Sequence, residues 1–192
     1  RLLDRIITAY PTLSERRRAR ATAHMLAMPD LRTVLAERDG IALVKLAARS
    51  SELDNQGFRL LELALLVPGD RVWRSVLDGV DLAYDRGGEK ALPRVFALLG
   101  PDKVLAAISD GRDRIRSAAI FEVSKLRDQR AVPELMACLE GTPRSIQEAA
   151  IYALGVLHSV EARPVLLALQ SREDTVASTR RVAWVALGRI GG

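Results

Sequence analysis

The stretch EAAIYALGVL (Glu148–Leu157) occurs three times in this chain in varied form. SAAIFEVSKL (Ser117–Leu126) precedes it and RVAWVALGRI (Arg181–Ile190) follows it, at nearly equal intervals along the chain. Within each copy Ala, Leu, Ile and Val recur at steps of three and four residues, which is the period of an α-helix with one buried face. The repetition therefore predicts three equivalent amphipathic helices.

The aligned copies predict which positions are buried. An alanine followed by a large apolar residue coincides in all three copies, at Ala119-Ile120, Ala150-Ile151 and Ala183-Trp184. Small side chains at the alanine position allow neighbouring helices to approach closely. We expect these residues in the core or in the seam between repeat units, Trp184 included.

The segments between the copies also match. AVPELMACL (Ala131–Leu139) and ARPVLLALQ (Ala162–Gln170) place Pro133 and Pro164 at equivalent positions of the repeat, and proline suits the first turn of a helix. Each unit is thus predicted to be a helix, a polar turn and a proline-started second helix. A hairpin of about 30 residues buries its apolar face only by stacking on its neighbours.

These residues resemble the short bacterial HEAT repeats known as phycobilisome-lyase-type HEAT-like repeats, most clearly over residues 111–192. The resemblance rests on Ile115-Arg116 ahead of the first aligned alanine and on Ala-Leu-Gly at 153–155 and 186–188. It implies an all-α fold, a right-handed α-solenoid of HEAT-like helical hairpins. The resemblance is specific for the fold and does not specify a function.

The resemblance also assigns a role to one polar position. Arg116 and Arg180 stand where the family carries an arginine that ties one repeat to an acidic group of the next. The middle copy departs from this pattern, because Gln147 replaces the arginine.

Upstream of residue 111 the pattern decays without vanishing. Helical pairs are predicted at 14–37, 57–79 and 91–110, and one extra helix at 41–49. We predict one HEAT-like α-solenoid over residues 1–192, with degenerate repeats over 1–110 and regular repeats over 111–192. A domain boundary near Gly87-Gly88 is the alternative.

Composition limits the remaining possibilities. The chain opens without Met and its third copy stops at Gly191-Gly192, so we expect a fragment of a longer protein. No run of 18 apolar residues occurs, so we predict no membrane span. Cys138 is the single cysteine, which rules out an internal disulfide and fits a reducing, cytoplasmic setting. Because Cys138 aligns with Leu169, we expect a buried and inert thiol.

The formal net charge of +5 is concentrated in residues 1–50. These hold ten Lys or Arg against five Asp or Glu, whereas residues 51–192 hold nineteen of each sign. The basic character centres on Arg16–Arg20, which lies on a predicted helix. This cluster is predicted to be solvated helix surface, with contact to an acidic partner or nucleic acid as the alternative.

No sequence pattern for catalysis is present. His24 and His158 lie in different units without a second ligand at metal spacing. A glycine-rich phosphate loop, a nucleophile elbow and a zinc-hydrolase motif are absent from the sequence. We therefore predict no enzymatic activity, no metal and no cofactor.

The function predicted from the repeats is a non-catalytic scaffold or adaptor that binds a protein or peptide partner, acidic in character, on the concave face of the solenoid. The second helices of the pairs line that face, so function is expected there and in the basic segment 1–50 rather than in the repeated phrase. Trp73 lies between two arginines and is expected either to contact the partner or to pack between units. The predicted partner contacts are Arg32, Arg71, Trp73, Arg74 and Lys103.

Two other functions are left open. One is nucleic-acid binding, by fold-level resemblance to HEAT-like DNA alkylation-repair glycosylases, although the neutral balance after residue 50 counts against a continuous basic track. The other is a bilin lyase or chaperone-like role, which only the name of the repeat family suggests.

Overall fold

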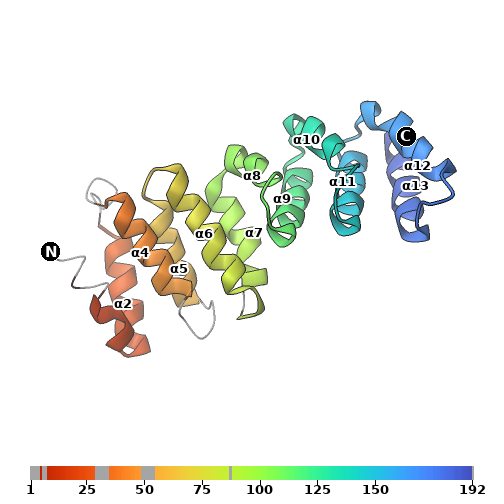
Figure 1. Cartoon of the computed structure of the whole chain (residues 1–192). Helices are drawn as coiled ribbons and strands as arrows, with labels where there is room; N and C mark the ends of the chain where they lie inside the picture. The colour runs from red at the N-terminus through yellow and green to blue at the C-terminus, as the bar shows by residue number, and fades with distance from the viewer. Residues whose placement is uncertain (1–4, 6–7, 29–34, 49–54, 87, 192) are drawn as a thin grey trace. The chain divides into compact units, whose positions relative to one another are not determined.

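The computed structural model describes residues 5, 8–28, 35–48, 55–86 and 88–191, and every regular element among them is helical (Figure 1). The all-α prediction is confirmed. The chain divides into two compact units, Arg1–Leu99 and Gly100–Gly192. The division lies between Leu99 and Gly100, and not at Gly87-Gly88. The single continuous array stays a prediction.

Unit 1 is a stack of helices around α5 (Asn55–Leu65), which packs against all the others. Its partners are α2 (Glu15–Leu26), α4 (Glu37–Ala48), α6 (Asp70–Leu82) and α7 (Gly88–Leu99). Aliphatic side chains such as Leu61 and Leu77 are fully buried. The predicted pair at 57–79 is confirmed as α5 and α6. Gly69, with φ 128°, makes the turn between them, in a region that favours glycine.

The basic cluster lies on α2, as predicted, and Ser14 is its N-cap residue by position, although its side chain makes no capping hydrogen bond. Arg18 folds back, because its Nε donates to the Leu13 carbonyl at 2.8 Å. Arg16, Arg17 and Arg20 are exposed. The charges therefore spread over more than one face of the helix, as expected.

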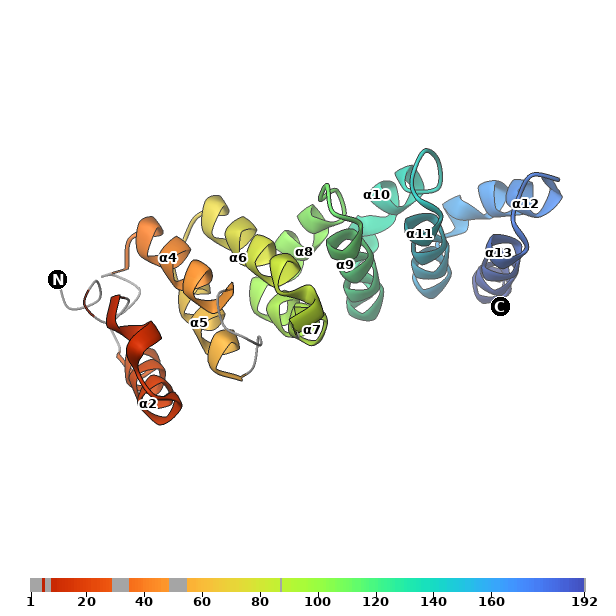
Figure 2. The same cartoon turned by 60° about the horizontal axis from the view of Figure 1, so that its bottom comes forward.

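Unit 2 has two layers of helices (Figures 1 and 2). The longer helices α9 (Asp113–Leu126), α11 (Arg144–Val156) and α13 (Ala177–Gly191) lie side by side in one layer. The shorter helices α8 (Pro101–Ala107), α10 (Val132–Ala137) and α12 (Arg163–Ser171) form the other. Pro133 and Pro164 occupy the second residue of α10 and of α12, which confirms the predicted proline-started helices.

The repeated phrase forms the long layer of unit 2. Its aligned alanines, Ala119, Ala150 and Ala183, are all fully buried. The layer is closely packed at Gly155, because a Cβ built on that glycine would lie 2.7 Å from the Cα of Ala186 on α13. The long helices α11 and α13 thus approach closely at Gly155, whereas the prediction placed the close approach at the aligned alanines.

The prediction for Trp184 is wrong. Its counterparts Ile120 and Ile151 are fully buried, but Trp184 is 71% exposed. Trp184 lies on α13, the last helix that the structure describes.

The turns between layers join each repeat to the next. Gln129, after α9, donates to the Leu157 carbonyl at 2.9 Å. His158, after α11, lies with Nδ1 2.6 Å from the Arg189 carbonyl, and it must donate because a carbonyl only accepts. His158 therefore has a structural role, joining the turn after α11 to α13.

Candidate functional site

The predicted contacts on α6 lie together, but Trp73 is not at the surface. Only 4% of Trp73 is exposed, so burial removes it as a direct partner contact. Its Nε1 donates to Asp70 Oδ1 at 3.1 Å, and the Arg74 guanidinium carbon lies 4.8 Å from its ring centroid. Sequence reasoning left both roles open, and packing is the one the structure shows.

The other predicted contacts lie on different elements of the chain, apart from Arg71, which shares α6 with Arg74. Arg71 is exposed and its Nε lies 3.3 Å from Glu37 Oε1, a surface ion pair of small energetic value. Lys103 is half-buried on α8 and belongs to unit 2. Arg32 lies outside the described residues.

A row of exposed side chains crosses the long layer of unit 2, two positions after each aligned alanine. We call Phe121 and Tyr152, together with the aliphatic Val185 at the equivalent position, the aromatic row. They are 43%, 38% and 46% exposed, and the ring centroids of Phe121 and Tyr152 are 5.9 Å apart with a 55° interplanar angle. Sequence reasoning missed this row, although aligning the copies brings the three positions together.

Basic side chains border the aromatic row, each one helical turn from a row member along its own helix. We call Lys125, Arg181 and Arg189 the basic rim. The Arg189 guanidinium carbon lies 4.8 Å from the ring centroid of Tyr152, a cation–π contact. The arrangement presents apolar surface and positive charge side by side.

Two acidic side chains of the same helices, Glu122 and Glu148, are engaged within the protein. Glu122 pairs with Lys125 at 3.0 Å. Glu148 on α11 accepts hydrogen bonds from the hydroxyls of Ser178 and Thr179, at 2.7 and 2.9 Å, and so joins α11 to α13. Glu148 therefore helps to hold two repeats together, whereas the Glu122 pair lies within one helix and Asp113 of α9 is exposed.

The family's arginine position does not act as predicted. Arg116 donates through Nε to the Ile108 carbonyl at 3.1 Å, and a terminal nitrogen lies 3.5 Å from Cys138 Sγ. Its partners are thus a carbonyl and a thiol, and not an acidic group. Cys138 is buried and free, as expected.

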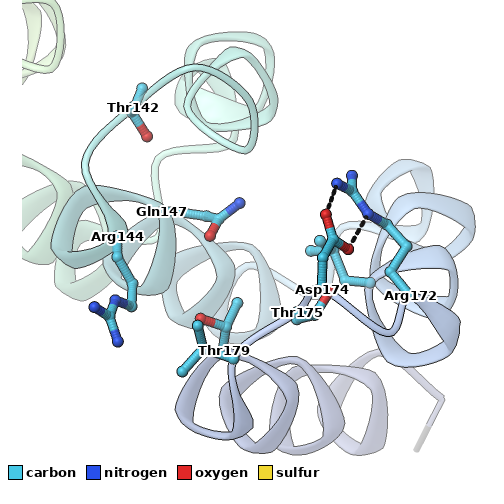
Figure 3. Close-up of a pocket in the computed structure, with 9 residues that line it drawn as sticks. Thr142, Arg144, Gln147, Arg172, Asp174, Thr175 and Thr179 are labelled. Carbon is cyan, nitrogen blue, oxygen red and sulfur yellow. Dashed lines mark hydrogen bonds and ion pairs between the residues drawn. The ribbon is translucent and has the colours of Figure 1, made fainter.

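A pocket of about 200 Å³ lies between the start of α11 and the α12–α13 turn (Figure 3). Arg144 stands on one side of it and the pair formed by Arg172 and Asp174 on the other. Arg172 donates to both carboxylate oxygens of Asp174, at 3.0 and 2.7 Å. These hydrogen bonds hold the pKa of Asp174 below its ordinary value.

Metal-binding clusters and membrane-spanning helices are both absent from the part of the chain that the structure describes. No group of three or more His, Cys, Asp or Glu residues is placed to hold a metal ion. None of the described helices combines the length and the apolar character that crossing a membrane requires.

Comparison with known proteins gives one family match. Residues 101–188 match the HEAT repeats, a segment that runs from the start of α8 into α13 and so begins within the stretch predicted as degenerate. No curated protein sequence matches the chain.

Among solved structures, the chain is similar to the crystal structure of an engineered protein, with 18% sequence identity and a TM-score of 0.49. The similarity covers 100% of this chain and 97% of the engineered one. The bacterial, lyase-type subgroup of repeats stays a prediction. The similarity to the HEAT repeats covers residues 101–188, somewhat less than half of the chain.

Proposed function

We propose that the chain is a non-catalytic scaffold that binds a protein partner through the aromatic row and the basic rim of unit 2. HEAT repeats generally mediate protein–protein interactions. One observation indicates this surface as the contact site. The exposed aromatic side chains of the described residues, Phe121, Tyr152 and Trp184, all belong to the long helices α9, α11 and α13.

The composition of the surface supports a protein partner. Aromatic residues and arginine are enriched at protein interfaces, and a few of them supply most of the binding energy. Tyr152 offers an apolar ring and a hydroxyl, and Arg189 stacked on that ring is held in place before binding. The fitting partner is a segment with apolar side chains and acidic neighbours, because the exposed charge beside the row is basic.

This proposal moves the contact surface away from the second helices. Trp73 is buried, and Arg71 already has Glu37 beside it. Concave-face binding through Arg71, Arg74 and Lys103 stays a competing prediction, and the test below includes it.

The test compares partner capture by four forms of the full chain: the wild type, two variants of unit 2 and the variant Arg71→Glu with Arg74→Glu. The double variant Phe121→Ser with Tyr152→Ser removes the two aromatic side chains of the aromatic row. Leu167→Ser removes an exposed apolar side chain from α12 in the other layer. Proteins captured by the wild type are identified by mass spectrometry, and their affinities are then measured by calorimetry. We expect the double variant to lose at least about 30-fold in affinity, which corresponds to about 2 kcal/mol at a hot spot.

The control variant Leu167→Ser should retain wild-type affinity, and circular dichroism checks that all forms are folded. Equal affinity of the double variant and the wild type for the same partner would refute the proposal. If Arg71→Glu with Arg74→Glu alone abolished binding, the second-helix prediction would stand instead.

We place the scaffold in the cytoplasm, supported by the free buried thiol of Cys138. The nucleic-acid and bilin-lyase alternatives stay predictions that no observed feature favours.

A further inference from the structure

The pocket at the start of α11 owes its space to a difference between two repeats. Arg116 and Gln147 hold equivalent positions and make the same first contact, each donating to the carbonyl of the residue eight positions earlier. Arg116 then extends its guanidinium to Cys138. Leu169 is the equivalent of Cys138 in the next repeat and lines the pocket. Gln147 is shorter than arginine and leaves open the space that the guanidinium fills in the preceding repeat.

Two of the hydroxyl groups around this pocket already use their protons. Thr142 donates to the Cys138 carbonyl at 2.7 Å, and Thr179 donates to Glu148. The Arg172 guanidinium is engaged with Asp174, which leaves little net charge from that pair.

Other donors remain available. Among the described residues, none accepts a hydrogen bond from the side chain of Arg144 or Thr175, and both line the pocket. Gln147 uses one N–H on the Leu139 carbonyl and keeps the second. The start of α13 adjoins the same pocket and adds the positive end of a helix. The available groups thus favour an anion.

The pocket wall is partly apolar. Leu169 and Val176 line it beside the polar groups. A ligand that fits both parts has a carboxylate on a short aliphatic stem, since methylene groups bury well against such side chains.

We propose that this pocket binds a short aliphatic carboxylate, the chemistry of a glutamate side chain. Thr175 and Gln147 serve as hydrogen-bond donors, and Arg144, whose guanidinium points away from Gln147 in Figure 3, turns toward the pocket as the ion-pair partner. The inference does not depend on the aromatic row, because it concerns a different surface and is tested with a small molecule. The same chemistry can come from a partner's glutamate or from a free dicarboxylic acid.

The test is a titration of the full chain followed by ¹⁵N chemical shifts. The probe is N-acetyl-glutamate amide, whose only charge is its side-chain carboxylate, and the control is the neutral N-acetyl-glutamine amide. We expect saturable shifts at the amides of Gln147 and Thr175 with a Kd of about 1 mM, a value in line with the efficiency of small ligands. Glutarate is titrated in parallel. Tighter binding of the peptide-like probe assigns the pocket to a partner's glutamate, and tighter binding of glutarate assigns it to a free acid.

Two variants separate a shaped site from general attraction of anions. Arg144→Gln should weaken binding by about tenfold or more, as loss of a charged hydrogen-bond partner does. Arg163→Gln, at an exposed position of α12 outside the pocket lining, should leave the Kd unchanged. Gln147→Arg restores the arginine of the preceding repeat and should fill the pocket and abolish binding. General attraction would make the added charge of Gln147→Arg strengthen binding, and that result would overturn the proposal. So would equal shifts with the neutral control, no saturable shift at all, or an unchanged Kd in Arg144→Gln.

Discussion

Replacement of Gly155 by alanine is expected to force α11 and α13 apart. A Cβ at this position would lie 2.7 Å from the Cα of Ala186 and 2.8 Å from its Cβ, well inside the optimal separation of about 3.5–4.0 Å between carbon atoms. The nearest atom belongs to the backbone, so no rotamer change relieves the contact. Gly188 holds the equivalent place in the last copy of the repeat, where a Cβ meets nothing within 4 Å. Gly188→Ala is therefore a matched control.

The magnitude follows from two opposing effects. Alanine is favoured over glycine inside a helix by about 1 kcal/mol, and both variants gain this term, somewhat less at Gly188 near the end of α13. Overpacking of a close contact costs about 1–3 kcal/mol, and only Gly155→Ala meets it. We expect Gly155→Ala to unfold with a free energy about 1–3 kcal/mol below that of Gly188→Ala.

Urea unfolding followed by circular dichroism gives the two free energies by linear extrapolation. Hydrogen exchange of peptides from α11 then assigns the loss to unit 2, because only the opening of that unit should become easier. Free energies of unfolding that agree within about 0.5 kcal/mol would refute the close packing at this seam.

Three further outcomes are expected. Trp184→Ser should change the free energy of unfolding by less than about 0.5 kcal/mol because the side chain is exposed, whereas Ile151→Ala should cost about 2–5 kcal/mol, both by urea unfolding. Trp73→Phe keeps an aromatic side chain but replaces the indole by a smaller ring and removes the hydrogen bond to the Asp70 carboxylate, and should cost at least about 1–3 kcal/mol by the same assay. Asp128 has its pKa lowered by hydrogen bonds from Arg130, so its stabilising contribution is present above its ordinary pKa of 3.8 and is lost as pH falls below it. Asp128→Asn should therefore lose stability at neutral pH and approach the wild type in acid, measured as the urea midpoint against pH; an equal difference at all pH values would contradict this.

The sequence predicts most of the fold because the apolar residues recur at the same places in each repeat. Ala119, Ala150 and Ala183 recur at the same place, and each is fully buried. Pro133 and Pro164 mark the starts of the second helices because proline lacks the N–H that the first turn leaves unpaired. Periodicity and proline chemistry are local properties, so they can be read without coordinates.

The surface was harder to predict because it depends on what covers each helix. Trp184 has the same place in the repeat as two buried isoleucines, yet nothing in the described chain packs over it. Trp73 lies between Arg71 and Arg74 in the sequence, yet its ring lies inside and only Arg74 stacks on it. A degenerate repeat fixes the helical phase too loosely to distinguish such cases.

The pocket beside Gln147 could be predicted only in part. The departure from arginine is visible in the sequence, but its consequence depends on the direct comparison with Arg116. That side chain reaches a carbonyl and a thiol, and not the acidic group that the resemblance implies. The length of the side chain, and not its charge partner, is what opens the pocket.

Site-specific photo-crosslinking tests the central claim, that the long layer of unit 2 is the contact surface, most directly. The photoreactive residue p-benzoyl-phenylalanine is placed at Phe121, at Tyr152 or, as the control in the other layer, at Leu167, and the full chain is irradiated with its captured partner. The proposal predicts the same partner adduct from Phe121 and Tyr152, suppressed by excess unmodified chain, and none from Leu167. An adduct from Leu167 without one from Phe121 or Tyr152 would contradict it.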